Sequence, residues 1–366
     1  MKTLLPFLLL LLLALLPESL SLPLTNKRGI STPLSCSKVN IIEQGTAPWS
    51  LQRISGTAPV TQNGRPTTEL SYKYRFTELE DGEGVEVYIV DTGIDVDHPE
   101  FGKRARNAIS TFDDDLEENS GHGTQIAGAI GSLTYGVAKN VSLVGIKVFS
   151  PLFDTKNPTA LISNITSGIE SAILLHNARR AAKNFKGSIM NLGFGFPKEI
   201  FDAAGQKASN EFKKMLQKAV DDGMHVTIAA GDRARDACTD FPAGFVKDIP
   251  ALIVVGATDV FDKRLQTADF GPCIDIHAPG VDIVSTTLRG VNGGIKVDSG
   301  TFLSAGIVTG VIAGEMGKNK NLRTDPVGMK RLVKDKALKG ILRGVEGGGD
   351  LLVYSGMPGN PVEEFV

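Results

Sequence analysis

Residues 85–93 read VEVYIVDTG, a short apolar run that ends in an acidic turn. The run has the length of a strand and is rich in β-branched residues. Four more runs of this kind follow it, at residues 141–148, 188–192, 225–230 and 252–256. Their nearly continuous apolar character is typical of strands that are buried on both faces of a sheet.

Helix-length segments separate these runs. Residues 159–183 and 209–222 place apolar side chains three and four positions apart, and the second segment stops at Gly223. Such alternation is typical of repeated βαβ units. The sequence therefore predicts an α/β fold, in which a mainly parallel sheet of about seven strands carries helices on both faces.

The composition limits the classes of partner. The chain has 366 residues, of which 42% are hydrophobic and 22% charged, and its formal net charge is -2. Lys and Arg are scattered among Asp and Glu, without a basic block or interleaved aromatic residues, so no nucleic acid is expected as a partner. We expect one domain, because no linker or break in composition divides the chain.

The first residues have the pattern of a signal peptide. Lys2 precedes an apolar run from Leu4 to Leu16, and small residues follow at Ser19 and Ser21. The run is shorter than the roughly 20 residues that a membrane span needs. We therefore expect residues 1–21 to be removed and the protein to be secreted to the extracellular space, with no membrane association afterwards.

Residues 22–43 form a short segment before the domain, which we expect to cover residues 44–366. Lys27 and Arg28 make a dibasic pair that suits a second cut after Arg28. The three cysteines at positions 36, 238 and 273 allow one disulfide and one spare thiol in an oxidising compartment. Two sequons predict N-glycosylation at Asn140 and Asn164.

Polar residues gather where the predicted strands end. Asp91 follows the strand that ends at Val90, and Asp232 follows the one that ends at Ala230. The tetrapeptide GHGT at residues 121–124 opens a helical stretch, 125–132. Ligand sites of parallel sheets lie beyond the carboxyl ends of the strands, so these three segments are the candidate functional site.

Three motifs in order carry a resemblance to a known family: VDTGI at 90–94, GHGT at 121–124 and SGT at 299–301, before an apolar helix. They resemble the subtilisin-like serine proteases, most of all the proteinase K branch, from about residue 44 to near the C-terminus. The resemblance implies the subtilisin-like three-layer sandwich. It also implies that Asp91 orients and stabilises the imidazole and that His122 is the general base.

The nucleophile motif departs from the family pattern. The family reads SGTSMATPH where this chain reads SGTFLSAGI, so that Phe302 stands at the serine position. A phenyl ring has no lone pair with which to attack a carbonyl group. Ser304 should point about 200° away around the helix, and Ser299 precedes the helix. We expect neither hydroxyl to reach His122.

The oxyanion position departs as well. The family reads AAGN where this chain reads AAGD, which puts Asp232 in place of the asparagine. An ionised carboxylate offers only acceptors and would repel the oxyanion. In addition, residues 22–43 are too short for the folding propeptide that such proteases carry. We therefore expect a catalytically inactive homologue.

The resemblance also implies several supporting features. It implies a disulfide between Cys238 and Cys273, which leaves Cys36 unpaired, and a structural Ca²⁺ bound by the Asp275 carboxylate and two carbonyl groups. The carbonyl groups would belong to Pro250 and Leu252. No organic cofactor is implied. The segment Asn191, Leu192 and Gly193 matches the strand that pairs with substrate backbone; otherwise it is simply part of the sheet.

Three functions remain open from the sequence. The first is a monomeric pseudoprotease that holds a peptide or protein ligand in the former active-site cleft. The second is a serine-type endopeptidase with residual or altered activity. The third is binding of a divalent cation, for which Asp91, His122 and Asp232 would converge on one point.

Overall fold

The computed structural model describes residues 40–112, 115–150 and 157–356 of the chain. The signal peptide, the cut after Arg28 and the thiol of Cys36 lie outside these residues. Seven α-helices are present in the described part: α1 (Trp49–Ser55), α2 (His122–Gly131), α3 (Pro158–Arg179), α4 (Lys198–Ala204), α5 (Gln206–Asp221), α6 (Thr301–Lys318) and α7 (Pro326–Lys336).

One sheet organises the unit, with strand order β14-β15-β11-β10-β8-β6-β3-β5-β4. Its strands are β3 (Glu86–Asp91), β4 (Ala105–Ser110), β5 (Ser142–Lys147), β6 (Ser188–Leu192), β8 (His225–Ala229), β10 (Ile253–Thr258), β11 (Ile276–Pro279), β14 (Leu338–Lys339) and β15 (Leu351–Leu352). Eight of them pair in parallel, and the two-residue strand β14 pairs antiparallel with β15 at one edge. The predicted α/β fold with a mainly parallel sheet is confirmed.

Three small antiparallel sheets surround this framework. Their strands are β1 (Ile41–Ala47) with β2 (Tyr72–Thr77), β7 (Phe196–Pro197) with β9 (Asp240–Phe241), and β12 (Ile283–Thr286) with β13 (Ile295–Asp298). The β12 and β13 hairpin leads directly into α6, because β13 ends at Asp298 and α6 starts at Thr301. The hairpin therefore sets the position at which α6 begins.

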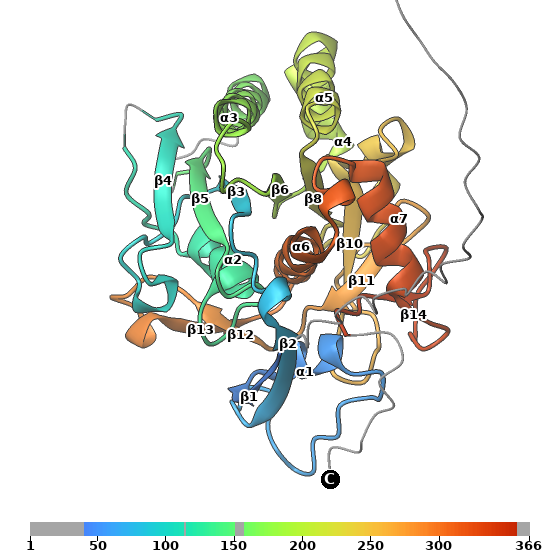
Figure 1. The fold of residues 1–366 in the computed structure, drawn as a ribbon. Helices are drawn as coiled ribbons and strands as arrows, with labels where there is room; N and C mark the ends of the chain where they lie inside the picture. Colours follow the sequence, from blue (N-terminus) through green and yellow to red (C-terminus); the bar gives the residue numbers. More distant parts are fainter. Residues whose placement is uncertain (1–39, 113–114, 151–156, 357–366) are drawn as a thin grey trace, which may run out of the picture. The chain divides into compact units, whose positions relative to one another are not determined.

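Helices cover both faces of the sheet, as Figure 1 shows. On one face, α2 and α6 pack over a core that includes Val87, Ile89, Ile126 and Ile307. On the other face, α3 and α5 pack over a second core that includes Ile165. Strand β3 contributes side chains to both cores, because successive side chains of a strand point to opposite faces of the sheet. This double burial explains why the run at residues 85–90 is almost wholly apolar.

The register places the candidate residues at one edge of the sheet. Glu86 opposes both Ser142 of β5 and Ser188 of β6, so the three strands run side by side from the same level. Asp91 is the last residue of β3 and opposes Lys147, the last residue of β5. Asp91 therefore lies at the carboxyl edge, where the sequence motifs predict a site.

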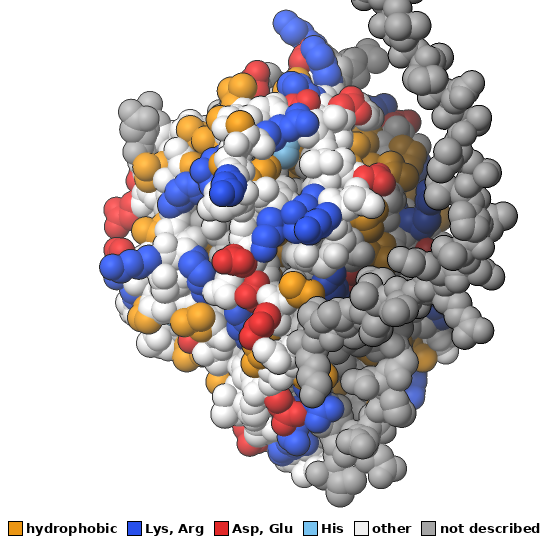
Figure 2. All heavy atoms as spheres, viewed as in Figure 1, with side chains coloured by type: hydrophobic (Ala, Val, Ile, Leu, Met, Phe, Trp, Pro, Cys, Tyr) orange, Lys and Arg blue, Asp and Glu red, His pale blue; other side chains and the backbone are white. Residues whose placement is uncertain are grey.

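The surface carries charges of both signs. On the face shown in Figure 2, Lys and Arg side chains lie among Asp and Glu side chains. The chain has nearly equal numbers of basic and acidic residues, 39 and 41, which gives the formal net charge of -2 and agrees with this mixture. Among the described residues, no helix has the length and apolarity that a bilayer crossing requires.

Candidate active site

Asp91 and His122 form the centre of the site. The Nδ1 atom of His122 lies 2.8 Å from Oδ1 of the Asp91 carboxylate. Asp91 is fully buried at the end of β3, whereas 36% of the His122 side chain is exposed at the start of α2. A buried carboxylate that accepts from Nδ1 leaves Nε2 of the imidazole on the outer side of the pair. The arrangement can therefore take up and hold a proton at His122.

The backbone around the pair explains its tight geometry. Asp91 Oδ1 also accepts from the amide of Thr92 at 2.8 Å, and the Thr92 hydroxyl accepts from the amide of Gly123 at 2.9 Å. A Cβ atom at Gly123 would lie 2.2 Å from the carbonyl oxygen of Gly93. Glycine at position 123 is therefore needed for the start of α2 to approach the turn after β3.

Two effects of opposite sign act on the pKa of His122. Burial lowers it, because the cationic imidazolium loses solvation. The negative charge of Asp91 and its hydrogen bond to the ring raise it and prevail, so that the pKa of His122 lies above its ordinary value of 6.5. The pair thus favours the protonated ring, as expected for an imidazole next to a buried carboxylate.

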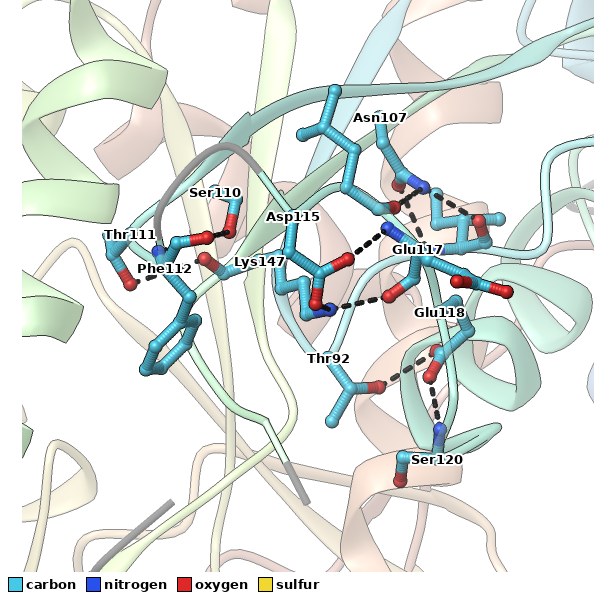
Figure 3. A network of polar contacts seen from close by, with 12 residues as sticks. Thr92, Asn107, Ser110, Thr111, Phe112, Asp115, Glu117, Glu118, Ser120 and Lys147 are labelled. Atoms are coloured by element: carbon cyan, nitrogen blue, oxygen red, sulfur yellow. Dashed lines mark hydrogen bonds and ion pairs between the residues drawn. The ribbon is translucent and has the colours of Figure 1, made fainter. Parts of the chain in front are cut away.

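The loop before His122 is held by a buried carboxylate that the sequence motifs do not reveal. Glu118 accepts from the amides of Ser120 at 2.7 Å and Gly121 at 2.9 Å, and from the hydroxyl of Thr92 at 2.8 Å. Figure 3 shows Glu118 pointing toward Thr92 and Ser120. Burial raises the pKa of Glu118, although its hydrogen bonds act against the rise. Glu118 therefore ties the loop of His122 to the turn of Asp91.

A buried lysine supports the same loop from the next strand. Lys147, at the end of β5, donates from Nζ to the Asp115 carboxylate at 2.7 Å and to the carbonyl oxygen of Glu117. These contacts also lie in the network of Figure 3. The burial of Lys147 could not be predicted from the sequence, because a single lysine at the end of a strand is usually exposed.

Phe302 faces the imidazole from the first turn of α6. The centroids of the two rings are 4.5 Å apart, and the ring planes are tilted by 32°. Phe302 is half-buried and packs against the core beneath α6. Offset rings at this distance are in favourable contact. The phenyl ring therefore covers part of the imidazole. This is the neighbour that we expected for a residue at the serine position of the motif.

The hydroxyls of the two neighbouring serines are hydrogen bonded to backbone groups. Ser304 is fully buried, and its hydroxyl lies 3.1 and 3.0 Å from the carbonyl oxygens of Ala278 and Pro279. The hydroxyl of Ser299 accepts from the amide of Asp282 at 2.9 Å. Among the described residues, neither hydroxyl is hydrogen bonded to the imidazole of His122, as we expected.

Asp232 caps the N-terminus of α6 from another segment. Both of its carboxylate oxygens lie 3.1 Å from the amide nitrogen of Thr301, and Oδ2 accepts from the Thr301 hydroxyl at 3.0 Å. The side chain keeps contact with solvent, yet partial loss of hydration raises the pKa of Asp232 against the lowering effect of these hydrogen bonds. A carboxylate at this place is stabilised by the positive end of the helix dipole.

A small pocket of about 190 Å³ lies beside Asp232. It is lined by Gly193, Phe194, Gly195, Ala229, Gly231, Asp232, Arg233 and Thr301. Of the three residues expected to pair with substrate backbone, only Gly193 lines it. The Asn191 amide instead donates to the hydroxyls of Thr227 and Thr309, and Leu192 is buried in the core.

The pairing of β6 limits where a peptide could add to the sheet. At Asn191, β6 is paired with Ile89 of β3 on one side and with Thr227 of β8 on the other. Leu192 is likewise paired, with Ile228. Asn191 is therefore paired on both sides, which leaves no place for an added strand there, whereas Leu192 is paired on the β8 side only.

The disulfide between Cys238 and Cys273 is present, with a Cα separation of 5.3 Å. It joins a turn after β8 to the segment before β11. The two half-cystines are 35 residues apart in the sequence and are both nearly buried. The pairing implied by the family resemblance is thus confirmed.

The residues expected to bind calcium do not fit that ion. The carbonyl oxygen of Leu252 accepts from Nζ of Lys330 at 2.6 Å, and the same ammonium group lies 2.8 Å from Oδ1 of Asp275. Pro250 lies in the exposed turn before β10. A lysine therefore contacts two of the three expected ligands. This lysine could not be foreseen, because α7 lies far along the chain from both of them.

A second expected metal site is not formed. We considered that Asp91, His122 and Asp232 converge on one divalent cation, but Asp232 turns its carboxylate to Thr301. In the described part of the chain, no three His, Cys, Asp or Glu side chains gather in a way that could hold a metal ion. The hypothesis of a shared metal site was wrong, because the amide and the hydroxyl of Thr301 at the start of α6 hold the Asp232 carboxylate.

The two predicted glycosylation sites differ in their surroundings. Asn140 is exposed in the turn before β5, where its amide donates to Asp81 at 2.9 Å. Asn164 is half-buried within α3. An exposed turn suits the attachment of a glycan better than the side of a packed helix, so Asn140 is the more accessible of the two positions.

Comparisons with known proteins agree with this geometry. Residues 82–353 match the Subtilase family, to which this chain therefore belongs. Subtilisin-like protease 3 of Saccharomyces cerevisiae is 35% identical over 325 residues, which cover 86% of this chain and 62% of that protein. Cerevisin of the same yeast is 35% identical over 273 residues, which cover 74% of this chain and 39% of that protein.

A solved structure gives the same result for the fold. The crystal structure of a cold adapted subtilisin-like serine proteinase superposes with a TM-score of 0.67 at 31% sequence identity. The match covers 85% of this chain and 98% of that one. The subtilisin-like fold is thus established. The chain nevertheless spans 62% or less of the two yeast relatives.

Proposed function

We propose that this chain is a pseudoprotease of the Subtilase family, which binds a peptide or protein segment in the cleft beside His122 and does not cleave it. The observation that supports this most directly is the contact of the Phe302 ring with the His122 imidazole at 4.5 Å between centroids. An acyl transfer by this family's chemistry needs a hydroxyl at that place, from which the imidazole takes the proton.

The surroundings of His122 support the same proposal. The hydroxyls of Ser299 and Ser304, the serines nearest to Phe302 in the sequence, are hydrogen bonded to backbone groups elsewhere. The Asp232 carboxylate takes the amide of Thr301 as its own partner and brings a negative charge to the N-terminus of α6. A developing oxyanion there would be repelled and would compete with Asp232 for donors.

The pocket beside Asp232 supports binding of a peptide side chain. Phe194 provides an apolar surface, and Arg233 donates to the carbonyl oxygen of Gly195 at 2.9 Å, which fixes the rim. A volume of about 190 Å³ suits one amino-acid side chain more than an organic cofactor. We propose that the protein is a monomer whose ligand is a peptide or a loop of another protein.

A peptidase with residual or altered activity is the second candidate. The intact contact of Asp91 with His122 at 2.8 Å favours it, because the base and its orienting carboxylate are both in place. Such an enzyme would need a nucleophile other than the hydroxyls of Ser299 and Ser304. Covalent labelling therefore separates the two candidates.

We further propose that the protein is secreted and glycosylated. The disulfide between Cys238 and Cys273 suits an oxidising compartment. The leader-like pattern of residues 1–21 and the exposed sequon at Asn140 point the same way. A secreted product whose mass falls on treatment with an N-glycosidase, and whose Asn140→Gln variant lacks that fall, would agree with this.

Labelling and binding test the proposal together. We expect a serine-directed fluorophosphonate probe to leave the purified chain unlabelled, whereas an active subtilisin-like protease in the same assay is labelled. Peptides selected from a displayed library should bind the wild type and lose affinity for the Phe194→Ala variant. The control is Phe261→Ala, which removes a phenyl ring that is 61% exposed outside this pocket. Labelling that depends on His122 would contradict the proposal.

A further inference from the structure

Helix α7 delivers two lysines to the segment between β10 and β11. Pro326 opens the helix, and the Asp325 carboxylate caps it by accepting from the amide of Gly328 at 2.8 Å. Met329 and Val333 are buried and anchor α7 to the core. Lys330 and Lys334 follow these two residues, one helical turn apart, and so share one side of the helix.

The ammonium group of Lys330 contacts two oxygen atoms from different segments. Its Nζ donates to the carbonyl oxygen of Leu252 at 2.6 Å and lies 2.8 Å from Oδ1 of Asp275. Only 13% of the Lys330 side chain and 10% of the Asp275 side chain are exposed. Lys334 approaches the same Oδ1 at 3.2 Å but is 38% exposed.

Asp275 is held in place independently of the lysines. Its Oδ2 accepts from the amide of Val254 at 3.1 Å, and its own amide donates to the carbonyl oxygen of Val254 at 2.9 Å. Asp275 thus has a fixed orientation, in which Oδ1 faces the ammonium groups. The carbonyl oxygen of Leu252 comes from the residue before β10, so one cation joins two neighbouring segments.

A calcium ion and this ammonium group exclude one another. Calcium binds six to eight oxygens at about 2.3 to 2.6 Å, and an ion shared by Leu252 and Asp275 would overlap Nζ of Lys330. Two lysines already face a single carboxylate, so the local charge is positive and repels a dication. In the described residues, no other acidic side chains join Asp275 in a metal-binding group.

We propose that the ammonium group of Lys330 is a built-in replacement for a divalent cation at Leu252 and Asp275. It bridges the turn before β10 to the start of β11, and the folded chain consequently needs no calcium at this position. The inference rests on the contacts of α7 and not on the proposed function at His122, so each can fail alone.

The first test uses the unaltered full-length chain. The thermal unfolding midpoint should be the same in a chelator and in millimolar calcium, because the site already holds a cation. A rise of the midpoint in calcium that disappears in the Asp275→Asn variant would overturn the proposal. That variant is needed because calcium bound elsewhere on the chain would keep its effect.

The second test separates Lys330 from its neighbour. Lys330→Met keeps the apolar stem but removes the ammonium group, and it should lower the unfolding midpoint more than the matched control Lys334→Met. In the Asp275→Asn background, Lys330→Met should cost less than in the wild type, since the pair is already broken. Equal losses for the two lysine variants, or an unchanged cost of Lys330→Met in that background, would contradict the proposal.

Discussion

The ring of Phe302 lies 4.5 Å from the imidazole of His122, centroid to centroid, at the point where α6 begins. Two features meet at this contact. The base retains its hydrogen bond to the buried Asp91 carboxylate, whereas the group opposite the base is a hydrocarbon. The site thus keeps the base and its orienting carboxylate, but the Phe302 side chain that faces the imidazole has no proton to transfer.

We first predict that Asp232 stabilises α6 as a cap. Asp232→Ala should lower the free energy of unfolding by about 1 kcal/mol, because the amide and hydroxyl of Thr301 lose their acceptor. Asp232→Asn should cost less, since the amide oxygen still accepts. Denaturant unfolding measures both. A free energy of unfolding for Asp232→Ala that equals or exceeds the wild-type value would contradict this stabilising role of the cap.

The second prediction concerns proton binding by His122. Its pKa is raised in the folded state, so protonation of His122 stabilises the fold below its ordinary value of 6.5, and this contribution is lost as the pH rises through the raised pKa. An NMR titration should give a midpoint above 6.5 for the wild type. The midpoint should fall in Asp91→Asn. A wild-type midpoint at or below the ordinary value would refute this.

Third, the disulfide should contribute substantially to stability. It closes a loop across a sequence separation of 35 residues. The chain-entropy relation gives about 3 to 4 kcal/mol for a loop of this size. The double variant Cys238→Ser, Cys273→Ser should therefore unfold at a clearly lower denaturant concentration. The same midpoint for this variant and the oxidised wild type would show that the bridge is not stabilising.

Much of the fold could be predicted because buried parallel strands have a simple pattern. The run at 188–192 coincides with β6, and the run at 225–230 ends one residue beyond β8. Strand β4 was not predicted, since its sequence ARNAIS at the sheet edge is half polar and is paired on one side only. Strand β11 was missed because it is short and contains His277 and Pro279.

The site was predictable to the extent that its residues lie in local motifs. The contact of Asp91 with His122 followed from two such motifs and is present at 2.8 Å. The contacts of Glu118 and Lys330 were not predicted, since a buried polar partner chosen by tertiary packing leaves no periodic signal. The carbonyl group of Leu252 is likewise invisible in a sequence, because every residue has one.

Restoring the serine and the asparagine of the family motifs tests whether their replacement explains the proposed inactivity. Phe302→Ser should place a hydroxyl opposite His122 and yield slight peptide hydrolysis, because Asp232 still disfavours the oxyanion. Adding Asp232→Asn should raise the rate by roughly 100-fold or more, a magnitude taken from the loss of one such donor in subtilisin. His122→Ala in that double variant should abolish the gain, since the serine would have no base.

The most direct measurement compares kcat/KM for one peptide substrate between the unaltered chain and the double variant Phe302→Ser, Asp232→Asn. If the chain is a pseudoprotease, it shows no turnover above the uncatalysed rate, whereas the double variant shows turnover that depends on His122. Hydrolysis by the unaltered chain at the rate of the double variant would contradict the proposed inactivity.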